Sequence, residues 1–162
     1  MKRIFLVTAL LLCLCFYACS KVAEYRDDVD TSDILKGAPH NVRSADDYAE
    51  YDDDFIEFFF GEMQASRDHT LLYSVEQNDI NEIGAFHAAT EDEALEFYEK
   101  TAEYISEMQS TQRAFIASYA PDELPKLDAA EVRRYGNYVV YAILPEADRA
   151  AFFSHVENTL NK

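Results

Sequence analysis

Apolar and polar residues alternate along the chain with periods that identify helices and strands. From Tyr48 to Phe60, aromatic residues recur at steps of three and four, which is the spacing of one helix face. Ser44-Ala45-Asp46-Asp47 has the form of a capping box that begins this helix, and Gly61 ends it. Further toward the N-terminus, Thr31-Ser32-Asp33 predicts a short capped helical turn that docks on the domain.

Four later segments have the composition of β-strands, and turn residues join them in pairs. Gln77-Asn78-Asp79 lies between the first two, and Gly136-Asn137 lies between the last two as a two-residue turn of type I′ or II′. The pattern therefore predicts two hairpins. Their strands span Thr70 to Glu76, Glu82 to Ala89, Ala130 to Tyr135 and Tyr138 to Leu144.

The turn at Gly136-Asn137 also sets the register of the second hairpin. It pairs Tyr135 with Tyr138, Arg133 with Val140 and Glu131 with Ala142 on one face, and leaves Val132, Val139, Tyr141 and Ile143 on the other face as core. The first face mixes aromatic and charged side chains, so we expect it to face solvent or a partner. Tyr135, Tyr138 and Arg133 are the candidate binding residues on it, because amphipathic aromatics and arginine favour recognition; a plain solvated sheet face is the alternative.

Residues typical of helix N-termini predict two more helices. Thr90-Glu91-Asp92-Glu93 is a second capping box, and the helix it begins runs to Pro121 with Ala94, Tyr98, Ala102, Ile105, Met108, Gln112, Ile116 and Tyr119 along one stripe. Pro145 begins a last helix from Glu146 to Leu160. The predicted fold is a single α+β domain in the order α-ββ-α-ββ-α, with an antiparallel four-stranded sheet covered mainly on one face.

The first 18 residues have the pattern of an export signal. Lys2 and Arg3 precede an apolar run from Ile4 to Tyr17, which is shorter than the roughly 20 residues that a membrane-spanning helix needs. Phe16-Tyr17-Ala18-Cys19 resembles the cleavage site of a bacterial lipoprotein, although Leu is usual where Phe16 stands and a smaller residue where Tyr17 stands. We therefore predict that Cys19 is lipidated; an ordinary cleaved signal that releases a soluble protein is the alternative.

The remaining chain divides into a short tether, residues 19–27, and a folded domain, residues 28–162. All three cysteines lie at or before Cys19, so the domain has no cysteine for a disulfide, thiol catalysis or a thiolate metal site. Without Lys2 and Arg3, 12 basic side chains face 31 acidic ones, a formal net charge of −19. Such a field repels phosphate backbones, so nucleic acid is excluded as a partner.

Catalytic and metal-binding motifs are missing from the sequence. The four glycines are isolated, which excludes a phosphate-cradling loop, and His40, His69, His87 and His155 do not form a paired metal motif. Asp52-Asp53-Asp54 lacks the alternation and the central Gly of a calcium loop, and is interpreted as a solvated helix face. We predict no cofactor and no metal.

Three segments together carry a family resemblance: Asn81 to Phe86, Tyr119 to Leu127, and Tyr135 to Tyr141. In this order they resemble the DUF4358 family, a domain of unknown function that is frequent in lipoproteins of Gram-positive, clostridia-like bacteria. The resemblance covers about Glu24 to the C-terminus. It implies an extracytoplasmic lipoprotein and brings no catalytic residues with it.

Two functions are compatible with the sequence. The first is a lipid-anchored module on the extracytoplasmic face of the cell membrane that binds an envelope protein or a small ligand. The second is an exported hydrolase that uses paired carboxylates for acid-base chemistry, because with 31 acidic residues some carboxylates will approach one another in space. A deep pocket with two facing buried carboxylates would favour the hydrolase, and a shallow surface of exposed aromatics would favour the binding module.

Overall fold

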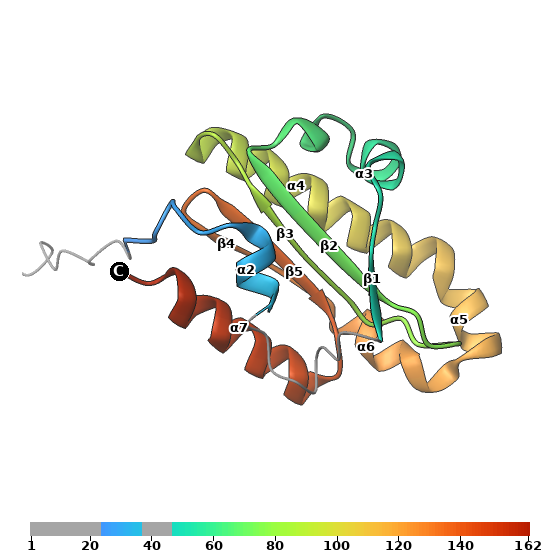
Figure 1. Ribbon diagram of the computed structural model, residues 1–162. Coiled ribbons are helices and arrows are strands. Elements are labelled where there is room, and N and C mark those ends of the chain that lie inside the picture. Colours follow the sequence, from blue (N-terminus) through green and yellow to red (C-terminus); the bar gives the residue numbers. More distant parts are fainter. Residues whose placement is uncertain (1–23, 37–46) are drawn as a thin grey trace, which may run out of the picture.

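The centre of the fold is a five-stranded antiparallel sheet with strand order β1-β2-β3-β5-β4 (Figure 1). The computed structural model describes residues 24–36 and 47–162. In these ranges the elements are α2 (Thr31–Lys36), β1 (Tyr48–Glu50), α3 (Asp53–Phe60), the 3-10 helix η1 (Gly61–Ala65), β2 (Asp68–Ser74), β3 (Glu82–His87), α4 (Glu91–Glu107), the π-helical η2 (Met108–Gln112), α5 (Arg113–Tyr119), the 3-10 helix η3 (Pro121–Glu123), α6 (Leu124–Asp128), β4 (Glu131–Tyr135), β5 (Tyr138–Ile143) and α7 (Glu146–Leu160).

The prediction of four strands was wrong because β1 is a strand and not the first turn of a helix. Tyr48 lies opposite Ser74 of β2 in antiparallel pairing, and the Tyr51 N–H donates to the carbonyl of Leu71 at 3.0 Å. The helix begins only at α3, where the Asp52 carboxylate accepts the N–H of Phe55 at 2.9 Å. Asp52 is therefore as good a cap as the earlier serine, and strand pairing decides which cap is used. Residues 44–46 of the expected capping box lie outside the described residues.

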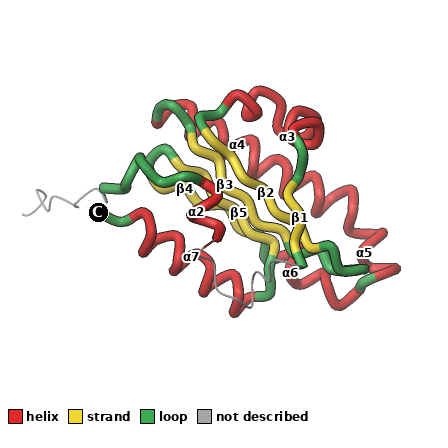
Figure 2. Tube along the Cα trace, in the orientation of Figure 1, coloured by secondary structure: helices red, strands yellow, loops and turns green. Residues whose placement is uncertain are grey.

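Helices cover both faces of the sheet, which corrects the expectation of one covered face (Figure 2). α3 and α4 pack on one face, and α2 and α7 pack on the other. Neighbouring residues of a strand therefore enter different cores: Val139 and Tyr141 belong to the first, and Tyr138 and Val140 to the second. All six residues of β5 are buried, as expected for a strand with both faces covered.

The second hairpin has the predicted register but not the predicted environment. Tyr135 pairs with Tyr138 across a turn in which Gly136 has a φ of +61°, a conformation that glycine adopts without strain. However, Tyr138, Val140 and Ala142 are fully buried under α2 and α7. α2 itself confirms the predicted short helix, and α7 has the predicted bounds and buries both Phe152 and Phe153.

The predicted long helix is interrupted by a π-helical turn. α4 ends at Glu107, and η2 then carries the chain into α5, which ends before Pro121. A π turn adds a residue to the helical repeat and rotates the positions that follow, so the predicted stripe does not continue unchanged, although Ile116 of α5 is buried as predicted. Tyr119, predicted to face the core, is 67% exposed, whereas Phe97 and Tyr104 of α4 are buried.

Candidate functional site

A hollow with a volume of about 1030 Å³ lies between η1 and α4. We call it the α4 groove. Its floor is apolar and is formed by Phe60, Met63 and Phe97, which are mostly buried. One wall consists of Gly61 and Ala65 of η1, and the other is a row of charged α4 side chains: Glu93, Glu96, Glu99, Lys100 and Glu103.

Local sequence signals fix both walls of the α4 groove. Gly61 follows α3 with a φ of +58°, and this left-handed backbone turns the chain from α3 into η1. A Cβ built on Gly61 would meet no atom within 4 Å, so this wall is open. At the start of α4, Thr90 Oγ1 accepts the N–H of Glu93 at 3.2 Å, and Glu93 in turn accepts the N–H of Ala89 at 2.5 Å. Thr90 is therefore the predicted N-cap, but the returning bond of the capping box goes to the N–H of Ala89 and not to that of Thr90.

The charged wall is strongly acidic. Glu96 and Glu99 are exposed, and neither forms an ion pair with a described residue. Lys100 is the single base among the groove residues, and its ammonium lies 3.7 Å from the carboxylate of Glu103. Four carboxylates against one ammonium give the wall a negative potential that favours a cationic ligand.

A buried polar cluster lies beneath the groove floor and is centred on Glu82. Its carboxylate accepts hydrogen bonds from the hydroxyls of Tyr141 at 2.5 Å, Tyr104 at 3.0 Å and Tyr51 at 3.0 Å. Tyr104 also packs its ring against Phe60, with 4.7 Å between the centroids. The Glu82 cluster therefore joins β3 and β5 to α4 and to the segment that precedes α3, and so supports the floor of the α4 groove.

Burial raises the pKa of the Glu82 carboxyl, and the three tyrosine hydrogen bonds only partly lower it. Burial, followed by the charge of Glu82, raises the pKa of Tyr104 and Tyr141 above the ordinary tyrosine value. The hydroxyls therefore remain protonated and serve as donors. Glu82 is the buried carboxylate among the described residues, and it does not line the α4 groove.

Gly84 makes the Glu82 cluster possible. It lies two residues after Glu82 on the same face of β3 and opposite Tyr141 of β5. A Cβ at Gly84 would lie 2.2 Å from Cε1 and 2.8 Å from Cζ of Tyr141. The absence of a side chain thus allows the Tyr141 ring to cross this position and reach the carboxylate.

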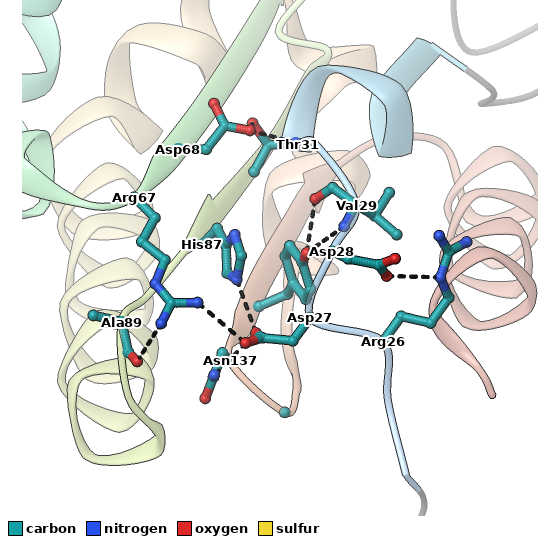
Figure 3. Close-up of polar contacts among 12 residues, drawn as sticks. Arg26, Asp27, Asp28, Val29, Thr31, Arg67, Asp68, His87, Ala89 and Asn137 are labelled. Atoms are coloured by element: carbon teal, nitrogen blue, oxygen red, sulfur yellow. Dashed lines mark hydrogen bonds and ion pairs between the residues drawn. The ribbon is translucent and has the colours of Figure 1, made fainter.

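The N-terminal segment of the described chain is fastened to the opposite region of the sheet (Figure 3). The Asp27 carboxylate accepts from His87 Nε2 and Asn137 Nδ2, both at 2.9 Å, and from Arg67 at 3.1 Å. Partial burial raises the pKa of Asp27, but these hydrogen bonds outweigh it and lower the pKa below its usual value. The His87 ring also stacks on Tyr138 with 4.2 Å between centroids.

The next residues continue this attachment. The Tyr138 hydroxyl accepts the N–H of Val29 at 2.9 Å and donates to its carbonyl at 2.7 Å. Thr31 donates through N and Oγ1 to Asp68 at 2.6 and 2.8 Å. Residues 24–31, which we call the strap, thus lie along the domain, including positions 24–27 that were expected to be tether.

The predicted binding residues of the second hairpin do not form an open surface. Tyr138 is fully buried and Tyr135 is 3% exposed, because α7 and the strap cover this face. Arg133 is partly exposed, but its guanidinium lies 4.2 Å from the ring centroid of Phe153 and pairs with Glu131 at 2.7 Å. The expectation of an exposed sheet face was therefore wrong. Cys19 lies outside the described residues.

The remaining acidic and histidine candidates are dispersed. Asp52 caps α3, and Asp53 lies 3.7 Å from His69. His87 binds Asp27, and His155 contacts Thr159 within α7. In residues 24–36 and 47–162, no three His, Cys, Asp or Glu side chains are grouped so as to hold a metal ion.

The protein is an α+β domain in which a five-stranded antiparallel sheet lies between two helical layers, with the α4 groove on one of them. Residues 44–144 match the family DUF4358, described as a domain of unknown function, and the chain belongs to this family. The match omits α2 and α7, the two helices on the second face of the sheet. No curated protein and no solved structure matches the chain. None of the helices that the structure describes has the length and apolar character needed to cross a bilayer.

Proposed function

We propose that the protein is a lipid-anchored binding module on the extracytoplasmic face of the membrane, and that it binds its partner in the α4 groove. The observation that carries the binding role is the groove itself. A volume of about 1030 Å³ is at the upper limit of the sizes usual for ligand sites. The buried Glu82 cluster holds this floor in place, which favours a preformed site.

The anchoring part of the proposal depends on the sequence around Cys19. A cysteine that directly follows Ala18 and an apolar run has the pattern of a lipidated N-terminus. Mass spectrometry of the processed protein is expected to find acyl chains on Cys19, and Cys19→Ala should move the protein out of the membrane fraction. An unmodified cysteine, or a Cys19→Ala variant that stays in the membrane fraction, would refute the anchor.

Photo-crosslinking in the native cell tests the binding role. A photoreactive amino acid replaces Glu99 on the groove wall in one strain and the exposed Glu76 in a control strain. We expect a discrete adduct from position 99 that is absent from position 76. Identical adduct patterns from both positions, or none from position 99, would contradict binding in the α4 groove.

Hydrolysis by paired carboxylates has less support. Glu82 is enclosed by tyrosine hydroxyls and does not open on the groove. A general acid-base pair must reach its substrate, so Glu82 is better explained as a support for the groove than as a catalytic group.

A further inference from the structure

Two neighbouring aromatic side chains of α3 lie in solvent. Phe58 is 80% exposed and Phe59 is 43% exposed, whereas Ile56 and Phe60 of the same helix are buried. Single exposed apolar residues are ordinary, but two adjacent rings form a contiguous apolar surface, which is the form that interaction sites take. Figure 1 shows α3 at the rim of the domain, away from the C-terminus.

The two exposed rings are held in place by ring contacts. The centroid of Phe59 lies 4.8 Å from that of Phe58, 4.6 Å from that of Phe55 and 5.6 Å from that of Tyr104. Phe55 in turn stacks on Tyr51 with 3.6 Å between centroids. Tyr51 and Tyr104 belong to the Glu82 cluster, so the exposed rings are attached to the core. A surface that is ordered before binding loses little conformational entropy when a partner docks.

Carboxylates lie beside the exposed rings. Asp54, Glu57 and Phe58 are spaced three and four apart, so they share one side of α3, and together they line an open hollow of about 480 Å³. Within residues 24–36 and 47–162, neither Asp54 nor Glu57 has an ion-pair partner. The last turn of α3 has no basic residue, and the negative end of the helix dipole adds to the negative charge there.

From this combination we infer that Asp54, Glu57, Phe58 and Phe59, which we call the α3 patch, dock an arginine on the surface of a protein partner. The guanidinium stacks on the Phe58 ring and donates to the carboxylates of Asp54 and Glu57, because its planar fork suits both an aromatic face and a carboxylate. Apolar residues beside that arginine contact Phe59. The α3 patch is a second surface, so this inference does not depend on binding in the α4 groove.

Charge selects this occupant over the two other surfaces that could cover exposed rings. A second copy of the chain would bring its own α3 carboxylates against these, and juxtaposed like charges oppose association. An anionic bilayer would meet the same repulsion. An arginine flanked by apolar residues is complementary to both the rings and the carboxylates.

Amide NMR titration of the processed chain, residues 20–162, with two capped dipeptides tests the inference. Arg-Leu carries the guanidinium, and citrulline-Leu has an uncharged end group of the same planar shape. We expect Arg-Leu to shift the amides of Asp53–Phe60. It should bind at least about fivefold more tightly than citrulline-Leu at low salt, and the difference should shrink at high salt.

A pair of variants tests the contribution of the ring. Phe58→Ser removes the exposed ring of α3, and Phe115→Ser removes a ring of α5 that is 60% exposed. Both side chains lie mainly in solvent, so both variants should fold. Phe58→Ser should weaken Arg-Leu binding by about fivefold or more, and Phe115→Ser should change it by less than about twofold.

A second pair separates the carboxylates of the α3 patch from the general acidity of the protein. Asp54→Asn/Glu57→Gln removes two charges from the patch, and Glu76→Gln/Asp122→Asn removes two charges from exposed positions elsewhere. The patch variant should weaken Arg-Leu binding by about fivefold or more, and the control should change it by less than about twofold.

Several outcomes would overturn the inference. These are the absence of shifts in α3, equal affinity for the two dipeptides, and equal effects of a patch variant and its control. A dimer in sedimentation that Phe58→Ser abolishes would make the α3 patch a self-association surface, and flotation with anionic vesicles that depends on Phe58 would make it a membrane contact. Either result also overturns the docking of an arginine. The adduct at position 99 reports on the α4 groove, so the proposed function is tested separately.

Discussion

Glu82 gives the sharpest test of the forces that hold the α4 groove in place. Glu82→Ala removes the acceptor of three tyrosine hydroxyls, two of them on the buried residues Tyr104 and Tyr141. Each buried hydroxyl left without a partner costs about 1–3 kcal/mol, and the void adds to this. The variant no longer has to bury a carboxylate, and this gain offsets part of the loss. We therefore expect the free energy of unfolding to fall by about 3–5 kcal/mol.

Glu82→Gln isolates the contribution of charge. It keeps the volume and one acceptor oxygen, and the tyrosine hydroxyls can rotate to accept from the new amide, so at low pH its cost should stay within about 1 kcal/mol. The raised pKa of Glu82 means that the folded state holds the proton more tightly than the unfolded state. This contribution to stability is complete below the unfolded pKa, about 4.3, and is lost as the pH rises through the folded pKa.

Urea unfolding of residues 20–162 between pH 4 and 8 measures this dependence. Within the window between the two pKa values, the wild type should lose up to about 1.4 kcal/mol per pH unit relative to Glu82→Gln. The exposed Glu76→Gln serves as the control and should follow the wild type throughout. A constant stability difference between Glu82→Gln and the wild type across this range would refute the conclusion that burial raises the pKa of the Glu82 carboxyl.

Three further substitutions test other contacts, each followed by urea unfolding. Gly84→Ala places a methyl group against the ring of Tyr141 and should cost about 2–3 kcal/mol; a neutral effect would show that the ring has room to move. Asp27→Asn should cost about 1 kcal/mol at pH 7, and the loss should vanish as the pH falls through the lowered pKa of Asp27; a loss that does not decrease at all as the pH falls would contradict the pairing. Lys126→Met leaves Asp79 without its ion pair at 2.8 Å and should cost about 2 kcal/mol, whereas an increase in stability would show that packing outweighs the pair.

Local signals in the sequence predicted the parts of the fold that depend on neighbouring residues. The turn at Gly136-Asn137 fixed the register of its hairpin, Thr90 began α4 and Pro145 preceded α7, because turns and caps are determined within a few positions. The choice between Ser44 and Asp52 as the cap of α3 could not be made in this way, since both are suitable and the pairing of Tyr48 with β2 decides.

Contacts between distant residues explain the remaining differences. Tyr138 looked like a surface residue, but its hydroxyl partner is Val29, 109 positions away. The uninterrupted apolar run of β5 was the available sign that both sheet faces are covered. The Glu82 cluster joins residues 51, 82, 104 and 141, and no local pattern brings these together. The α4 groove could likewise not be predicted from local patterns, because it depends on where η1 lies against α4.

The strap also limits how far the domain can stand from a lipid on Cys19. Five residue steps separate Cys19 from Glu24, so the segment that connects them is at most about 18 Å long. At Glu24 the described chain already lies beside Lys162. Glu91, at the start of α4, borders the same small hollow as Glu24 and Asp27. Under the proposed anchoring, the N-terminal end of α4 therefore lies on the tethered side of the domain, and a partner of the α4 groove would have to approach the membrane surface to be captured.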